Sequence, residues 1–328
     1  MLKTRLLSAV IGVLFVFSIA QPLVSAQSTT APGGSGLSIT PTISQFTLSP
    51  NQSTGLKITL KDAAKGAVIA QGSVVDFVSD GKSGTPKLLT QPGASSPNSI
   101  KSFVSSIAPV PLQPGEQKDL NLTVKAPSNI PPGAYYGVVR FKAIPQINGN
   151  QPTGGKVALT ASVATIVLIT VPGNLKQQIQ LADIHVYRGA RDSSIFFSKP
   201  NKIGIEIRNL GNGFSRPFGS VDVENSFGKS IGRFQFNNPQ QLGNVLPNSS
   251  RIFTSDFNKF NKIGRYTITA NVSDSNGQVL NSTKTIWYIP AWIVIAVVAV
   301  IIILAFLTFR TYRRYRHDNR LVSKRHNR

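Results

Sequence analysis

The chain has 328 residues, with 35 lysine and arginine residues against 13 acidic ones and a formal net charge of +22. It contains no cysteine, which excludes disulfide bonds, thiol chemistry and cysteine-based metal sites. His185 is the one histidine that precedes residue 310, so sites built from several histidines are excluded as well.

The N-terminal 26 residues have the order of a secretory signal peptide. Lys3 and Arg5 precede an apolar run from Leu6 to Ala20, and Val24-Ser25-Ala26 supplies the small residues of a cleavage site. A retained N-terminal anchor is the alternative. In both cases the chain that follows is exported, and residues 27–36 (QSTTAPGGSG) form a flexible leader.

Residues 37–175 predict a first β-sandwich domain. Residues 55–60 (GLKITL) and 117–124 (QKDLNLTV) alternate polar and apolar side chains, as half-buried strands do. Residues 71–78 are a further strand candidate, with Val75 and Phe77 on one face. The domain closes with a predicted antiparallel hairpin that consists of residues 130–141 (IPPGAYYGVVRF), a turn-rich connection at 148–155 and the apolar run 157–171.

Residues 176–286 predict a second β-sandwich domain of the immunoglobulin-like kind. Turn signals such as residues 210–213 (LGNG) and 274–277 (DSNG) separate short strand candidates, and no helical period lies between them. His185 belongs to the opening strand, where a structural role is favoured over catalysis. The other strand candidates are residues 203–207, 220–223, 231–236, 251–253, 266–272 and 279–286.

One transmembrane helix is predicted at residues 287–309. Ala291 to Phe309 carries no charge and spans about 28 Å as a helix, which matches the hydrocarbon core of a bilayer. Trp287, Tyr288 and Trp292 stand at its front edge, where such rings favour the membrane interface. The eight cations and one acid of residues 310–328 place this basic tail in the cytoplasm and the two domains outside. A buried core helix is the alternative.

The fold class is therefore all-β, with two tandem immunoglobulin-like β-sandwich domains followed by one transmembrane helix. The exported part keeps 25 cations and 12 acids, a net charge near +13, which attracts polyanions such as wall polymers. Nucleic acid is disfavoured as a partner because the cations are spread out and the chain is exported. No phosphate loop, calcium loop or carboxylate pair stands out, so we expect no enzyme activity, no metal and no cofactor.

Tyr135, Tyr136 and Arg140 are the candidate ligand-binding residues. Neighbouring residues of a strand point to opposite faces, so one tyrosine belongs in the core and the other points outward. Tyr136 and Arg140 are four residues apart and therefore lie on the same face, which we expect to be the outward one. An outward tyrosine beside an arginine can stack on a sugar and pair with a carboxylate or phosphate. The alternative is an ordinary cross-strand pair on a solvated face. A sheet edge that accepts a partner's strand is a second candidate surface.

Both predicted domains carry short motifs in a fixed order. They are Pro114-Gly115, Lys125-Ala126-Pro127, Pro132 to Phe141, Val171-Pro172-Gly173, Arg208 to Asn212, Pro217-Phe218-Gly219, Phe227-Gly228-Lys229, Val245 to Arg251 and Gly264-Arg265-Tyr266-Thr267. With the span and the basic tail, this order resembles the WxL-interacting proteins of bacterial cell surfaces. The resemblance implies a peptidoglycan-binding domain, a second domain that binds a host or surface protein, and one span.

We therefore expect a membrane-anchored cell-surface binding protein that attaches to cell-wall polymer and to a surface or host protein. The alternative is a structural or accessory scaffold subunit of an envelope complex, with no ligand of its own.

Overall fold

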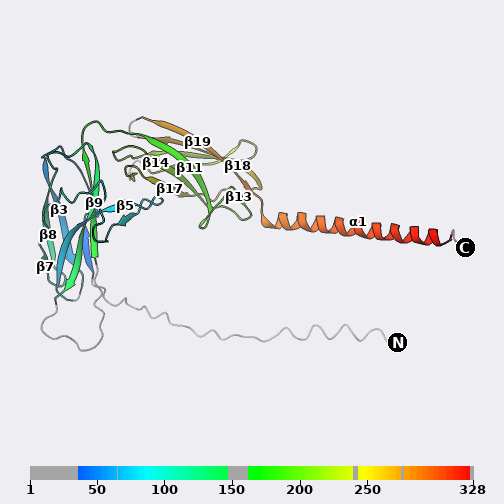
Figure 1. Ribbon diagram of the computed structural model, residues 1–328, viewed down its shortest axis with the longest axis horizontal. Helices are drawn as coiled ribbons and strands as arrows, with labels where there is room; N and C mark the ends of the chain where they lie inside the picture. The colour runs from blue at the N-terminus through cyan, green and yellow to red at the C-terminus, as the bar shows by residue number, and fades with distance from the viewer. Residues whose placement is uncertain (1–35, 65, 147–161, 239–242, 275–276, 326–328) are drawn as a thin grey trace, which may run out of the picture.

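The computed structural model describes residues 36–64, 66–146, 162–238, 243–274 and 277–325, with only the backbone described for 314–325. The predicted signal peptide, the leader up to residue 35 and the 148–155 connection lie outside these ranges. The described strands form two β-sandwiches, and a single helix follows them (Figure 1). The predicted fold class of two tandem immunoglobulin-like sandwiches with one apolar C-terminal helix is confirmed.

The first sandwich packs a three-stranded sheet, in the order β1-β3-β8, against a five-stranded sheet, in the order β2-β10-β9-β4-β7. The alternation predicted for β3 is confirmed, since Leu56, Ile58 and Leu60 are buried between more exposed neighbours. The strands β9 and β10 pair as the predicted antiparallel hairpin. The bounds are β1 Leu37–Thr40, β2 Ile43–Thr47, β3 Ser53–Asp62, β4 Val68–Val75, β7 Val110–Leu112, β8 Gln117–Lys125, β9 Gly133–Pro145 and β10 Ser162–Val171.

The strand predicted at residues 71–78 is divided, which corrects that expectation. The strand β4 ends at Val75, and Phe77 begins β5 (Phe77–Ser79), which pairs with β6 (Pro86–Leu88) in a separate two-stranded ribbon. Asp76 between them is fully buried, and its carboxylate accepts hydrogen bonds from the backbone N–H of Ser96 and the hydroxyl of Ser99. Because these bonds hold Asp76 to a neighbouring loop, the chain leaves the sheet at this point.

The second sandwich packs a four-stranded sheet, in the order β12-β11-β14-β17, against a five-stranded sheet, in the order β13-β19-β18-β15-β16. All six strand candidates of this domain are confirmed, and His185 lies in its first strand as predicted. The short strands β12 and β13 were not predicted. The bounds are β11 Ile179–Arg188, β12 Arg191–Asp192, β13 Ile195–Phe196, β14 Lys202–Asn209, β15 Phe218–Glu224, β16 Ser230–Phe236, β17 Ser250–Asp256, β18 Gly264–Ser273 and β19 Val279–Tyr288.

The loop that follows β14 fastens the two sandwiches together. Asn209 is buried, and its side-chain amide donates to two backbone carbonyls, which fixes the loop from inside. Asn212 donates from Nδ2 to the carbonyl of Pro132 at 3.1 Å, and its own carbonyl accepts the backbone N–H of Ala134 at 2.8 Å. The sequence motif Arg208 to Asn212 therefore ties the second sandwich to the start of β9 in the first.

The helix α1 (Ala291–Arg325) extends away from the second sandwich (Figure 1). Its segment Ala291–Arg313 has a mean hydropathy of 3.1 and is not buried by the rest of the chain, so it is not a core helix. It is long and apolar enough to cross a membrane. The helix begins at Ala291 rather than at residue 287 because Trp287 and Tyr288 belong to β19, and it continues past Phe309 into the basic tail.

Candidate functional site

An apolar cluster lies where the two sandwiches meet. Tyr136 of β9 is at its centre, with its ring centroid 5.0 Å from that of Phe77 in the ribbon and 6.2 Å from that of Phe214 in the second sandwich. Leu168 of β10 and Leu246 of the second sandwich pack against the same cluster. The contact between the sandwiches is therefore a packed aromatic and aliphatic interface.

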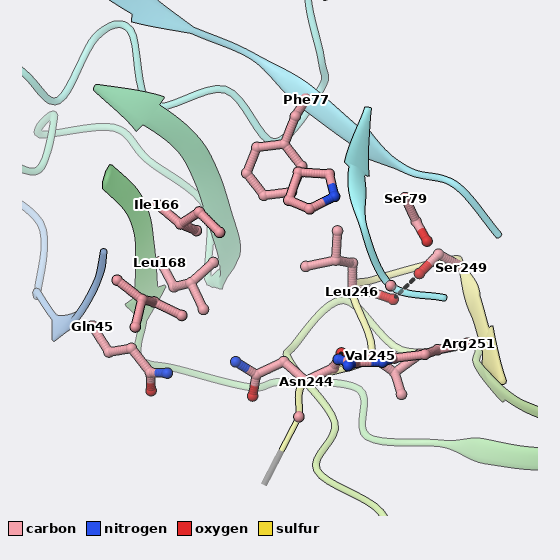
Figure 2. Close-up of a pocket in the computed structure, with 14 residues that line it drawn as sticks. Gln45, Phe77, Ser79, Ile166, Leu168, Asn244, Val245, Leu246, Ser249 and Arg251 are labelled. Atoms are coloured by element: carbon pink, nitrogen blue, oxygen red, sulfur yellow. Dashed lines mark hydrogen bonds between the residues drawn. The ribbon is translucent and has the colours of Figure 1, made fainter. Parts of the chain in front are cut away.

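A cavity of about 350 Å³ opens beside this cluster, between the two sandwiches (Figure 2). Figure 2 shows Phe77, Ile166, Leu168 and Leu246 around it, with polar side chains along one side. Those polar side chains include Gln45, Asn244 and Arg251. A mostly apolar cavity with a few convergent polar groups is the usual composition of a ligand site.

Arg251 of β17 is the charged side chain among the described residues that line this cavity. Its Nη1 donates to the carbonyl of Asn244 at 2.9 Å, and its guanidinium carbon lies 4.9 Å from the centroid of the Phe253 ring. Its buried Nε has no hydrogen-bond partner. Burial lowers the pKa of Arg251 below its usual value, and the nearby Asp80 carboxylate partly offsets this.

The tip of the ribbon bridges the two sandwiches beside the cavity. The carbonyl of Lys82 accepts the backbone N–H of Ile252 at 2.6 Å, and the hydroxyl of Ser79 donates to the carbonyl of Ser250 at 3.3 Å. Both acceptor and donor on the second sandwich belong to β17, the outer strand of its four-stranded sheet. The ribbon therefore covers part of that sheet edge and holds β17 beside the cavity.

The shape of the ribbon tip depends on Asp80. The hydroxyl of Ser83 and the backbone N–H groups of Lys82, Ser83 and Gly84 donate to its carboxylate, and they hold the pKa of Asp80 well below its usual range. Gly84 has a φ of 78°, and a Cβ at this position would lie 2.4 Å from Nε of Arg251. Only glycine lets the loop pass so close to the guanidinium.

The residues predicted to bind ligand do not share one surface. Tyr135 and Tyr136 point to opposite faces of β9, as predicted, but both are buried, with 9% and 5% of their surfaces exposed. The expectation that Tyr136 stands outward is wrong, because the ribbon and the second sandwich cover its face of the sheet. Arg140 is half-buried and lines a separate polar pocket. The ligand role of Tyr135, Tyr136 and Arg140 stays a prediction.

Sequence patterns did not identify the cavity residues. The fourteen lining residues come from four segments, around residues 43–45, 77–86, 166–168 and 243–251, and they share no sequence motif. The one available signal was Arg251, a cation directly before the apolar pair Ile252 and Phe253. Without the fold, that signal does not show which other segments lie beside Arg251.

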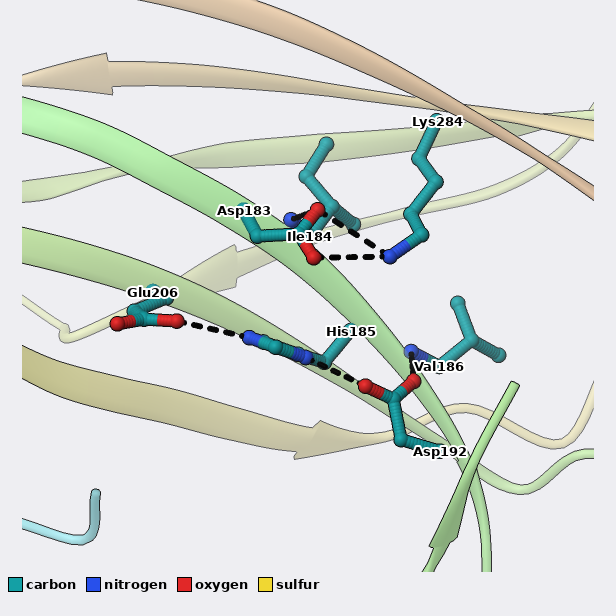
Figure 3. A network of polar contacts seen from close by, with 7 residues as sticks. All are labelled: Asp183, Ile184, His185, Val186, Asp192, Glu206 and Lys284. Atoms are coloured by element: carbon teal, nitrogen blue, oxygen red, sulfur yellow. Dashed lines mark hydrogen bonds and ion pairs between the residues drawn. The ribbon is translucent and has the colours of Figure 1, made fainter. Parts of the chain in front are cut away.

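A second group of polar side chains surrounds His185 in the second sandwich (Figure 3). Its Nδ1 lies 2.6 Å from Oδ2 of Asp192, and its Nε2 lies 3.0 Å from Oε2 of Glu206. Burial alone would lower the pKa of His185, but the hydrogen bonds to Asp192 and Glu206 outweigh it and raise the pKa above 6.5. Both ring nitrogens contact carboxylates, which requires the doubly protonated imidazolium, so His185 is placed as a structural cation and not as a general base.

We expect this contact to make stability depend on pH. Because the pKa is higher in the folded than in the unfolded state, the stabilisation is fully present below about pH 6.5 and is lost as the pH rises through the folded value. Thermal unfolding of the wild type and a His185→Gln variant should therefore differ more near pH 5.5, below the unfolded pKa of about 6.5, than near pH 8. A constant difference between these pH values would contradict the charged assignment.

Comparisons with known proteins show a distant likeness in fold. No protein family and no curated protein matches the sequence. A solved structure of a chaperone–tip adhesin complex of CFA/I fimbriae is 16% identical, with a TM-score of 0.38, over 76% of this chain and 98% of that one. The class 5 fimbrial chaperone CfaA is 15% identical, with a TM-score of 0.38, over 76% and 99%. The Salmonella enterica SafA pilin–SafB chaperone complex contains a chain that is 14% identical, with a TM-score of 0.32, over 77% and 96%. Likenesses this distant carry no functional conclusion for this chain.

Proposed function

We propose that this chain is a membrane-anchored cell-surface protein that binds a protein partner in the cavity between its two sandwiches and attaches to anionic cell-wall polymer. The cavity is the observation that carries the proposal. It is apolar, it lies between two domains, and it holds the buried Arg251 cation with an N–H group that no described residue accepts. The chain acts by binding and not by catalysis.

The neighbouring sheet edge suggests what kind of partner fits. Among the described strands, β2 is the outer strand of its sheet and pairs with β10 alone. Ile43 and Gln45 of β2 also line the cavity. An extended peptide segment that paired with the free edge of β2 would place an apolar side chain into the cavity. Such a segment is the partner chemistry that we propose.

The helix and the basic surface support the rest of the proposal. An apolar segment of 23 residues follows the second sandwich and supplies the anchor. The exported part has a net charge near +13, which favours contact with an acidic polymer. The scaffold subunit without a ligand remains the competing function, since an interface as well packed as the one at Tyr136 also suits a rigid spacer.

Sedimentation with cell-wall sacculi distinguishes these functions. The full chain in detergent micelles is mixed with sacculi that carry their surface proteins and with sacculi stripped by protease. The mixtures are compared in low salt and in about 1 M salt, where the Debye length falls to about 3 Å and loose charge attraction is screened. Salt-resistant pelleting with stripped sacculi supports polymer binding, and pelleting only with intact sacculi supports a protein partner. No pelleting in either case would leave the scaffold function.

A charge at the mouth of the cavity should abolish partner binding. Ile43 is 45% exposed, so Ile43→Asp is tolerated by the fold but places a carboxylate where the partner's apolar side chain enters. We expect salt-resistant binding to protein-bearing sacculi to weaken by tenfold or more, as burial of an unpaired charge costs several kcal/mol. Ile144→Asp is the matched control, because Ile144 is 39% exposed in the same sheet and does not line the cavity. Equal binding by both variants would place the partner elsewhere.

A further inference from the structure

A second pocket, which we name the Arg140 pocket, lies on the face of the five-stranded sheet that also carries Tyr136. Its volume is about 230 Å³, and it opens between β4, β9 and the loop that follows the ribbon. Arg140 and Lys101 line it together with Thr90, Gln91 and Ser95. The described lining contains two cations and no acidic residue.

The two cations of this pocket differ in their partners. Lys101 is already paired, since its Nζ lies 3.0 Å from Oδ2 of the buried Asp76 and donates to the carbonyl of Ala94 at 3.3 Å. Arg140 has no ion pair among the described residues, and its Nε is buried without a hydrogen-bond partner. One positive charge of the pocket is therefore uncompensated, and it carries an N–H group without an acceptor.

An oxyanion is the ligand that this arrangement recognises. Because Arg140 lines the pocket and has no ion pair among the described residues, an anion in the pocket would pair with its positive charge. A planar guanidinium can offer two parallel N–H groups to a carboxylate or a phosphate. A cationic or purely apolar ligand would leave this charge unpaired.

We propose that the Arg140 pocket binds a single phosphate or carboxylate group of an anionic cell-wall polymer. This inference rests on the wall attachment proposed above, and it names the chemical group of the polymer that the protein would contact. Arg140 is the residue that contacts the anion, and Lys101 is a positioning residue held by Asp76. The pocket is distinct from the cavity between the sandwiches, so it leaves that cavity to the partner protein.

Lys142 offers a matched control for Arg140. It follows Arg140 by two residues on β9, so it lies on the same face of the sheet, and it carries the same charge on an exposed side chain. It does not line the pocket. Arg140→Met and Lys142→Met therefore remove the same long-range charge, while only the first removes a guanidinium that lines the pocket.

The test titrates the full chain in detergent micelles with two polymers, poly(glycerol phosphate) and polygalacturonate, which separate a phosphate source from a carboxylate source. We expect the wild type to bind at least one of them, and Arg140→Met to weaken that binding about ten- to a hundredfold, the loss of a hydrogen bond to a charged group. Lys142→Met should weaken it less than about threefold, as for a solvated surface charge. Arg140→Lys keeps the positive charge but loses the two parallel N–H groups of the guanidinium. Its affinity for the polymer should therefore lie between those of Arg140→Met and Lys142→Met.

Three outcomes would overturn this inference. Equal weakening by Arg140→Met and Lys142→Met would mean a diffuse charge attraction. If the wild type bound stripped sacculi but neither polymer, the pocket would be rejected and the proposed wall attachment would stand. If it bound neither the stripped sacculi nor the polymers, the wall attachment would be rejected too. A lower unfolding temperature for Arg140→Met than for Lys142→Met would show that the guanidinium has a structural partner.

Discussion

Replacing Tyr136 with alanine is expected to destabilise the protein by about 3–5 kcal/mol and to separate the unfolding of its two sandwiches. The ring is 5% exposed and contacts aromatic rings of the ribbon and of the second sandwich. Its removal leaves a void at the joint, where we expect the packed interface of the wild type to couple the unfolding of the two sandwiches. We therefore expect one calorimetric transition in the wild type and two in the variant.

The control for this prediction is Phe227→Ala. Phe227 is 91% exposed, so its removal takes no buried surface away and should leave the unfolding temperature unchanged. Tyr135→Phe gives a second reference, because it removes only the hydroxyl that donates to the carbonyl of Pro131 at 2.9 Å. A single unshifted transition in Tyr136→Ala would mean that the aromatic cluster does not couple the sandwiches.

Ending the chain after Ile289 is expected to release the protein from the membrane almost completely. The truncation keeps β19 whole and removes α1, whose Leu, Ile, Phe and Val residues each favour insertion by about 0.3–0.6 kcal/mol. The measurement is the share of protein in the membrane fraction after cell breakage. Protease added to intact cells then reports whether the sandwiches of the full chain lie outside.

The control ends after Arg313 and keeps the whole apolar segment Ala291–Arg313. It should stay in the membrane fraction, since the charges that it loses lie beyond the span. If the chain ending at Ile289 also stayed there, the N-terminal segment would be a retained anchor and not a cleaved signal peptide.

The strands were predictable because their signal is local. The alternation of Leu56, Ile58 and Leu60 with polar neighbours fixes β3 and its buried face, and the apolar run that becomes β10 requires burial on both sides. The apolar C-terminal helix was predictable for a related reason, since length and lack of charge mark it as a candidate membrane span. In each case one segment carries all the information that the prediction needs.

The candidate binding surfaces were not predictable because they depend on contacts between distant segments. Parity correctly placed Tyr136 opposite Tyr135, but that face is covered by the ribbon, which leaves the sheet at Asp76, and by Phe214 and Leu246 of the second sandwich. The cavity joins Ile43 to Arg251, more than two hundred positions apart. Arg140 was identified from its residue type, whereas its unpaired Nε is a property of the folded pocket alone.

The connection between the second sandwich and the helix bears on how the protein carries load. Two residues, Ile289 and Pro290, separate α1 from β19, and β19 pairs with β18 in antiparallel register from Val279 to Tyr288. Hydrogen bonds in such a pair run across the strands, so a pull along β19 strains the whole ladder at once, in shear, and does not open it bond by bond. If α1 is held in a bilayer, a chain without a single cysteine thus meets tension on the second sandwich with the β18–β19 ladder rather than with a disulfide.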